Sequence, residues 1–227
     1  MKYKTILLDI DNTLLDFTAS QDIAFGKLLN DVGIPYSDAL KEKYLAINHQ
    51  LWHDHEAGHI PKETIMEQRF ARSFEDYEIN MSGYEMDDKF RQHVENHPIL
   101  MPNAKELLAK ITDKYTLAIV TNGISRTQHK RLHNVGIHDI FEAIVISSDV
   151  GATKPSPVFF DYTFKQLPHA DKTTTLIIGD SLSADIQGGN LAGITTVWYN
   201  PKQIENTSNI IPDYEITDLM ELLSIVE

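Results

Sequence analysis

The chain begins with a short apolar run that leads straight into two acidic residues. The pattern of residues 3–8 predicts a buried β-strand, and Asp9 and Asp11 follow it, two positions apart. An unpaired buried carboxylate is costly and takes up a proton instead, so acids at the end of a buried strand need a partner. A divalent cation such as Mg²⁺ is the usual partner, because it is held by one or two carboxylates plus a substrate phosphate. We therefore expect more carboxylates and phosphate-binding groups at the ends of other strands.

The composition excludes several classes of protein. The 227 residues are 42% hydrophobic and 23% charged, which is ordinary for a globular protein. Cysteine is absent from the sequence, which rules out disulfides and thiolate metal ligands. The net charge of -13 argues against a nucleic-acid partner, because such binding needs a basic face. A small phosphorylated metabolite is compatible with that charge, since a cation, a lysine and backbone N–H groups can form a locally positive pocket.

The N-terminus enters a strand directly, without the basic and apolar regions of a targeting signal. No apolar run in the sequence is long enough to cross a bilayer. We therefore expect a cytoplasmic protein with no membrane association. The sequence leaves the choice between a monomer and a homodimer open.

A helical segment interrupts the chain after the first strand. Apolar residues recur at three- and four-residue spacing, which predicts helices. The predicted helices cover residues 23–32, 40–51, 61–74 and 84–94. They predict a helical bundle over residues 17–97, inserted into a domain made of residues 1–16 and 98–227.

From residue 98 the pattern alternates between helix and strand. Predicted strands cover residues 116–121, 143–147, 174–179, 195–198 and 214–216. Predicted helices cover residues 103–112, 126–135, 157–166 and 184–192, with a last helix from residue 218. This alternation predicts an α/β fold, a Rossmann-like parallel sheet with helices on both faces.

Polar residues follow the predicted strands at the points where ligands bind in open parallel sheets. They are Thr121 and Asn122 after one strand, Lys154 after another, and Asp180 and Asp185 after a third. Together with the two acids after the first strand, these groups form the set needed to hold Mg²⁺ and a phosphate.

Four short motifs carry a family resemblance. They are residues 9–13 (DIDNT), 120–122 (VTN), 154–155 (KP) and 179–185 (GDSLSAD). In this order after apolar strands, they closely resemble the four motifs of the haloacid dehalogenase-like (HAD) hydrolases. Four motifs in order are specific where one would be weak. The resemblance covers nearly the whole chain and implies a HAD core with an inserted helical cap.

The resemblance implies a role for each motif residue. Asp9 would attack phosphorus and become an aspartyl-phosphate, and Asp11 would protonate the leaving oxygen and then activate water. Thr121 and the N–H of Asn122 would hold phosphate oxygens, and Lys154 would pair with the phosphate and Asp9.

The same resemblance implies a metal site. Asp9, Asp180 and the backbone carbonyl of Asp11 would hold Mg²⁺, for which Mn²⁺ can substitute. Asp185 would lie among these ligands or just behind them.

Asp11 bears on the reaction type. A halide leaves a carbon atom without a proton, whereas an alkoxide leaving group gains from an acid, typically by ~10²–10⁴-fold. An acid at this position therefore favours a phosphatase or a phosphomutase over a dehalogenase.

The inserted segment resembles a specific group of caps. Residues 48–52, 56–60 and 69–70 are similar to the cap of bacterial pyrimidine 5′-nucleotidases, which implies a nucleoside monophosphate as substrate. Trp52, Asn48 and Arg69 could contact a nucleobase through a ring face and polar donors. Equally, Trp52 could belong to the core of the bundle and Arg69 could be the surface partner of an acid.

Other hypotheses remain open from the sequence. The protein could hydrolyse sugar phosphates such as phosphoglycolate, could be a phosphosugar mutase, or could be a binding module that keeps only the fold. The intact acids argue against the last of these. His49, His53, His55 and His59 suggest a zinc site, but a hydrophilic helix face explains them more simply.

Overall fold

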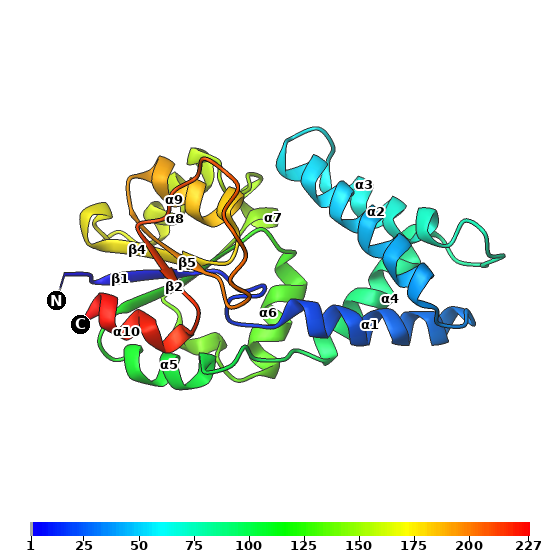
Figure 1. Ribbon diagram of the computed structural model, residues 1–227, viewed down its shortest axis with the longest axis horizontal. Helices are drawn as coiled ribbons and strands as arrows, with labels where there is room; N and C mark the ends of the chain where they lie inside the picture. The colour runs from blue at the N-terminus through cyan, green and yellow to red at the C-terminus, as the bar shows by residue number, and fades with distance from the viewer. Residues whose placement is uncertain (1) are drawn as a thin grey trace. The chain divides into compact units, whose positions relative to one another are not determined.

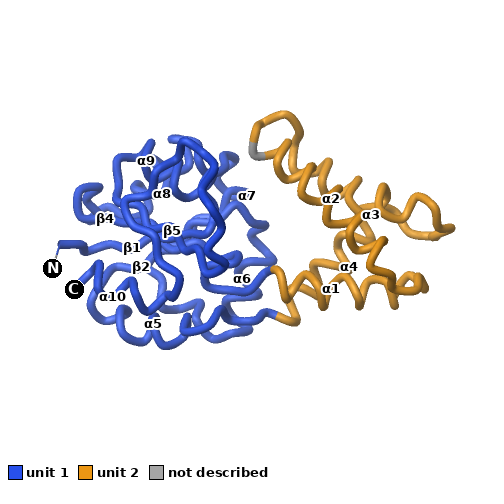
Figure 2. The backbone as a smooth tube through the Cα atoms, viewed as in Figure 1, with its two compact units in different colours: residues 1–17, 98–227 blue, residues 18–97 orange. Residues whose placement is uncertain are grey.

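The computed structural model of the protein describes residues 2–227, with only the backbone at Glu56 (Figure 1). The chain divides into two compact units (Figure 2). One unit combines residues up to 17 with residues 98–227, and the other comprises residues 18–97. In the described part of the chain, no helix is both long and apolar enough to cross a membrane.

The first unit is built on a parallel sheet. Among the described residues, six strands lie in the order β3-β2-β1-β4-β5-β6. The strands are β1 (Thr5–Leu8), β2 (Thr116–Thr121), β3 (Ala143–Ile146), β4 (Thr175–Gly179), β5 (Thr195–Tyr199) and β6 (Tyr214–Ile216). β1 lies between β2 and β4, with Leu8 in register with Ile119 and Ile178. The predicted α/β fold with a parallel sheet is confirmed, and the central strand is the one that leads into the two acids.

Helices cover both faces of this sheet (Figure 1). They are α5 (Ala104–Ile111), α6 (Ser125–Asn134), α7 (Ser147–Val150), α8 (Pro157–Gln166), α9 (Gln187–Ala192) and α10 (Leu222–Val226). Ile6 and Leu8 of β1 belong to the same buried cluster as Leu107 of α5, whereas Leu7 belongs to the cluster of Phe159 in α8. Successive strand residues point to opposite faces, so a strand covered on both faces must be apolar throughout.

Two local predictions differ from the structure in detail. The helix predicted over residues 184–192 begins instead with a π-helical turn (Leu182–Ile186), and α9 follows it. Ser147 does not end a strand but begins the short helix α7. Both differences lie directly after a strand, at the carboxyl edge of the sheet.

The second unit consists of α1 (Phe17–Val32), α2 (Asp38–Glu56), α3 (Lys62–Ser73) and α4 (Gly83–Asn96), as the apolar spacing predicted. Side chains cap two of the helices. The Ser37 hydroxyl accepts from the backbone N–H of Leu40, and Ser82 forms a reciprocal capping box with Glu85.

Stacked aromatic rings fill the core of the second unit. The Tyr44 ring stacks on Phe25 at 4.7 Å and on Phe70 at 5.2 Å between centroids. Phe90 packs on Phe70 at 5.1 Å, and Phe74 closes the cluster. Each of these side chains is at most 2% exposed, so the rings form a buried aromatic core in this unit.

A buried ion pair crosses this core. Asp87 of α4 has no exposed surface, and it accepts from Arg69 Nε at 2.8 Å and from Arg91 Nε at 2.6 Å. The Arg69 guanidinium also lies over the Phe90 ring, 4.7 Å from its centroid. Because both charges are removed from water, each depends on the other for its solvation.

We expect Asp87→Ala to reduce the free energy of unfolding by about 3–5 kcal/mol, because it leaves the Arg69 charge buried without its carboxylate. Urea unfolding followed by circular dichroism measures this loss. Asp88→Ala is the matched control, since that neighbouring side chain is 40% exposed and its pair with Arg91 is worth at most about 1 kcal/mol. Equal losses in the two variants would contradict the importance of the buried pair.

Candidate active site

The loop after β1 presents both N-terminal acids. Asp9 is 5% exposed, whereas the Asp11 side chain is 31% exposed. The chain turns sharply after Asp11, with Asn12 in the left-handed region (φ 59°) and the N–H of Leu15 donating to the carbonyl of Ile10. Asparagine tolerates this conformation better than most residues. The turn therefore fixes the two carboxylates on adjacent parts of one short loop.

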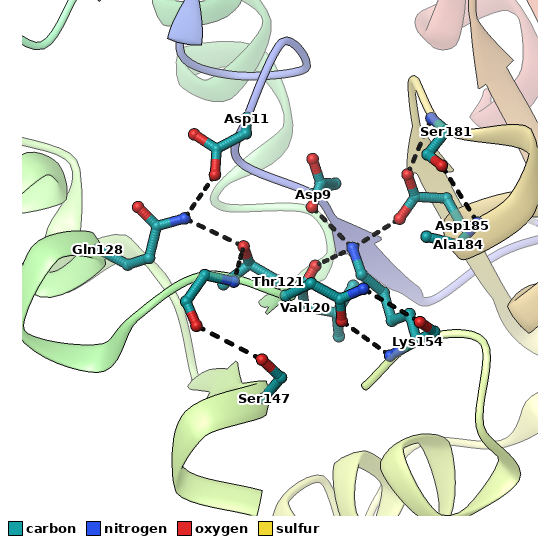
Figure 3. Close-up of polar contacts among 12 residues, drawn as sticks. Asp9, Asp11, Val120, Thr121, Gln128, Ser147, Lys154, Ser181, Ala184 and Asp185 are labelled. Atoms are coloured by element: carbon teal, nitrogen blue, oxygen red, sulfur yellow. Dashed lines mark hydrogen bonds and ion pairs between the residues drawn. The ribbon is translucent and has the colours of Figure 1, made fainter. Parts of the chain in front are cut away.

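Lys154 is a buried cation that lies between two acids of the site. Its ammonium donates to Asp9 Oδ1 at 2.7 Å, to Asp185 Oδ1 at 2.6 Å and to the Val120 carbonyl at 2.7 Å (Figure 3). Burial alone would lower the pKa of Lys154, but the Asp185 and Asp9 carboxylates outweigh it and raise that pKa above its usual value. Lys154 is therefore a fixed positive charge between two strand-end acids.

Asn122 holds the backbone of Lys154 in place. The Asn122 amide donates to the Lys154 carbonyl at 3.0 Å, and its oxygen accepts from the Lys154 N–H at 2.8 Å. The peptide bond from Lys154 to Pro155 is cis. This pair of hydrogen bonds joins the loop after β2 to the loop that carries the lysine.

Asp9, Asp180 and Asp185 form a compact acidic cluster, with one oxygen of each within 4.8 Å of the others. The π-helical turn brings Asp185 back toward β4, and the N–H of Ser181 donates to Asp185 Oδ2 at 3.1 Å. Gly179 makes this approach possible, because a Cβ there would lie 2.1 Å from the Asp185 carboxyl carbon. π-Helical turns are rare in proteins and occur frequently at functional sites.

The electrostatics of the cluster favour a bound cation. Burial raises the pKa of Asp9 well above its usual value, and the neighbouring Asp185 and Asp180 carboxylates add to that rise while Lys154 opposes it. Burial and Asp185 raise the pKa of Asp180 to about 7. The single charge of Lys154 cannot balance the three carboxylates of the cluster. The atoms that the cluster offers to a metal ion are all carboxylate oxygens. The residues therefore fit a hard divalent cation such as Mg²⁺ or Mn²⁺.

Asp11 is held by two side chains of α6 that the sequence analysis missed. Arg131 Nη1 donates to Asp11 Oδ1 at 2.5 Å, and Gln128 Nε2 donates to Asp11 Oδ2 at 2.8 Å. Gln128 and Arg131 are each 1% exposed, and they bond to each other at 2.7 Å. Their spacing of three places them on one helix face. In the sequence, this spacing in the helix after Thr121 was the one sign that the two side chains could act together.

Thr121 connects this network to the phosphate-binding loop predicted after β2. Its hydroxyl accepts from Gln128 Nε2 at 3.1 Å and from the N–H of Gly123 at 3.2 Å (Figure 3). A Cβ at Gly123 would lie 2.4 Å from Gln128 Nε2, so glycine makes room for the glutamine. Gln128 thus contacts both the second acid and the predicted phosphate ligand.

Trp198 is a further residue that the motif analysis did not assign. Its indole N–H donates to the Asp180 carbonyl at 2.9 Å, and the ring is 5% exposed in β5. A buried donor on the neighbouring strand thereby fixes the backbone that carries the Asp180 carboxylate.

The predicted base-binding residues lie in the helical unit. Arg69 is 4% and Asn48 9% exposed, and Arg69 Nη1 donates to Asn48 Oδ1 at 3.2 Å. Arg69 does pair with an acid, Asp87, but the pair is buried and not at the surface as predicted. Trp52 is half-buried and lies edge-on to His55, with Lys62 over its ring face.

The histidines of α2 and its following loop do not form the zinc site considered from the sequence. Among the described residues, neither group of clustered metal-ligating atoms includes a histidine of residues 49–59. His55 is bonded instead to the Ile60 carbonyl at 3.0 Å.

A sequence profile of haloacid dehalogenase-like hydrolases matches residues 3–193. The chain belongs to this family. The resemblance drawn from the four motifs is confirmed, and the motif residues converge at the carboxyl edge of the HAD sheet as described above.

Individual relatives span the whole of this HAD-like hydrolase. HAD-hydrolase YfnB of Bacillus subtilis is 39% identical over 99% of this chain and 96% of that protein. Pyrimidine 5′-nucleotidase PynA of Streptococcus pneumoniae is 36% identical (100% and 96% covered), and pyrimidine 5′-nucleotidase YjjG of Escherichia coli is 31% identical (98% and 97%). The crystal structure of YfnB bound to magnesium superimposes over 100% of both chains with a TM-score of 0.94.

The raised pKa of Asp180 predicts a stability that depends on pH. The folded protein holds a proton on this carboxyl up to about pH 7, whereas the unfolded chain releases it near pH 3.8. The stabilisation that this proton provides is therefore fully present below about pH 4 and is lost as pH rises through about 7. We expect Asp180→Asn to flatten this contribution.

The measurement is the melting temperature between pH 5 and pH 8 in EDTA, and again with excess Mg²⁺. Added Mg²⁺ should raise the melting temperature more at pH 8 than at pH 5, because protons compete with the cation for the carboxylates. A Mg²⁺ effect that is independent of pH would contradict this account.

Proposed function

We propose that this HAD-like hydrolase is a Mg²⁺-dependent phosphatase of small phosphomonoesters, with pyrimidine nucleoside monophosphates as its substrates. The observation that carries the proposal is the pair of strand-end acids in contrasting environments. Asp9 is buried against Lys154, whereas Asp11 is partly exposed and held by Gln128 and Arg131. Two carboxyl groups with different surroundings can take different roles in one reaction.

Asp9 is the nucleophile in this proposal. A carboxylate attacks an anionic phosphate only if their repulsion is neutralised, and the Lys154 ammonium at 2.7 Å supplies positive charge at the attacking group. Attack forms a bond from Asp9 to phosphorus as the bond to the ester oxygen breaks. The product of this step is an aspartyl-phosphate on Asp9.

Asp11 is the acid and then the base. It gives a proton to the departing ester oxygen and later takes one from the water that hydrolyses the aspartyl-phosphate. The donors on α6 orient its carboxylate without burying it, so it remains accessible to a leaving group. A halide would need no such proton, which favours an ester substrate.

Thr121, Asn122 and Lys154 bind the transferring phosphoryl group. The charge of a loose transition state lies on the equatorial oxygens, where fixed donors and cations stabilise it. The hydrogen bonds between Asn122 and Lys154 make these groups one rigid unit, which supports the assignment.

Asp9, Asp180 and the Asp11 carbonyl would hold Mg²⁺, with Asp185 beside them. The ion would neutralise charge on the phosphate oxygens. The raised pKa values of Asp9 and Asp180, and the magnesium described for the YfnB structure, support this assignment.

The nucleotide substrate is supported by two full-length relatives that are named pyrimidine 5′-nucleotidases. We assign residues 17–97 as the cap, a unit that excludes water and contributes specificity. Trp52 is the side chain that we assign to the nucleobase, because its ring is only half-buried. Asn48 and Arg69, which hydrogen-bond to each other, are the other two residues that we assign to substrate recognition.

The test is phosphate release with Mg²⁺ from a panel of nucleoside monophosphates and sugar phosphates, with an EDTA control. We expect dUMP, dTMP and UMP to be preferred, and Asp9→Asn to abolish turnover because an amide cannot form the intermediate. A preference for sugar phosphates would overturn the nucleotidase assignment, and an isomerised product without free phosphate would indicate a mutase. Unchanged activity in Asp9→Asn would overturn the mechanism.

Arg131 provides a second test, because it positions Asp11 for proton transfer. We expect Arg131→Met to lower the turnover of a nucleotide by about 10²-fold, within the range for acid and base catalysis. With p-nitrophenyl phosphate, whose leaving group needs no acid, the pre-steady-state burst of nitrophenolate should keep its rate while turnover falls.

Arg126→Met is the matched control, since it removes an exposed arginine from the same helix and should leave both rates unchanged. Arg131→Lys should recover part of the lost turnover. If Arg131→Met slows the burst as much as the turnover, Arg131 has a structural role and not the positioning role assigned here.

A further inference from the structure

Histidines gather at the end of α6, outside the acidic site. His129 Nδ1 lies 2.9 Å from His138 Nε2, and the His133 and His138 rings stack with centroids 3.6 Å apart. Ligand atoms of His133, His138 and Asp139 all lie within 4.8 Å of one another. The proposed phosphatase reaction uses none of these residues.

The local sequence builds this cluster. His129 and His133 are four residues apart, so they lie on one face of α6, one turn from each other. Gly136 then ends the helix in the left-handed conformation (φ 71°), and the N–H of Ile137 donates to the Leu132 carbonyl at 3.1 Å. This turn brings His138 back beside the two helix histidines.

Buried side chains anchor the backbone that carries the cluster. Leu132 and Ile137 are 0% and 5% exposed in the same buried cluster under the sheet. His133 is exposed and His129 and His138 are half-buried, so the rings are reachable from solvent on a fixed backbone.

The hydrogen bonds of the cluster favour a tautomer of His138 with a nitrogen lone pair available to a metal ion. His138 Nδ1 lies 2.9 Å from the Asp139 carboxylate, which favours the tautomer with the proton on Nδ1 and leaves the Nε2 lone pair pointing at His129. Neutral imidazoles are the form that binds metal ions.

We propose that His129, His133 and His138 bind one late transition-metal cation, such as Cu²⁺, Ni²⁺ or Zn²⁺, with Asp139 as a fourth ligand or as the support of His138. Nitrogens bound to one tetrahedral ion at about 2.1 Å lie about 3.4 Å apart, so the 2.9 Å separation of His129 and His138 needs to open only slightly. The His133 ring must turn out of its stacked orientation, which its exposure allows.

This site differs from the acidic one in its choice of metal. Imidazole nitrogen suits copper, nickel and zinc, whereas Mg²⁺ requires oxygen ligands. Excess Mg²⁺ therefore leaves the histidine site free while it competes for Asp9, Asp180 and Asp185. The inference does not depend on the proposed reaction.

The test uses Cu²⁺ and electron paramagnetic resonance, because superhyperfine lines from nitrogen distinguish imidazole ligation from carboxylate ligation. The protein carries no affinity tag and is kept in excess Mg²⁺ with less than one equivalent of Cu²⁺. His49 and His53 of α2 are also four residues apart and would compete, so the reference protein carries His49→Gln and His53→Gln.

We expect this reference protein to show the nitrogen pattern of at least two imidazoles. Adding His133→Gln and His138→Gln should remove it, whereas adding His169→Gln, at an exposed histidine elsewhere, should not. Circular dichroism checks that each variant is folded. Absence of the nitrogen pattern from the reference protein, or its persistence in the His133→Gln and His138→Gln variant, overturns the proposal.

Discussion

The buried ammonium of Lys154 is the interaction on which the rest of the site depends. It joins the acid after β1 to the acid after β4, and its third hydrogen bond goes to the Val120 carbonyl near the end of β2. A lysine 2% exposed would be costly if unpaired, and the same is true of Asp9 and Asp185. The central strands are therefore held in one arrangement at their carboxyl ends by charges that cannot be separated cheaply.

The same arrangement leaves an imbalance that gives the site its chemistry. One lysine faces Asp9, Asp180 and Asp185, so burial raises the pKa of Asp9 and brings that of Asp180 to about 7. A fold selected for stability alone would replace such acids with apolar residues. Gly179 leaves room for the Asp185 carboxylate beside β4, and the unbalanced negative charge of the cluster fits a bound cation.

The fold class could be predicted from the sequence because each strand and each helix has its own pattern of apolar residues. Strands buried on both faces are apolar throughout, and the acids at their ends stood out against that background. The network of Gln128 and Arg131 was missed because polar residues on a helix ordinarily face water, and only the tertiary fold turns this face toward Asp11. Likewise, the π-helical turn before α9 was not predicted, because helix propensity does not distinguish a π-helical turn from an α-helical one.

α6 carries two stripes of polar side chains in different environments. Residues 128 and 131 face inward, where burial fixes the donors that orient a carboxylate. Residues 129 and 133 occupy the adjoining stripe, where partial exposure keeps imidazole nitrogens available. With 3.6 residues in each turn, each residue of the helix is rotated by about 100° from the one before it. Residues that are adjacent in sequence therefore face different environments.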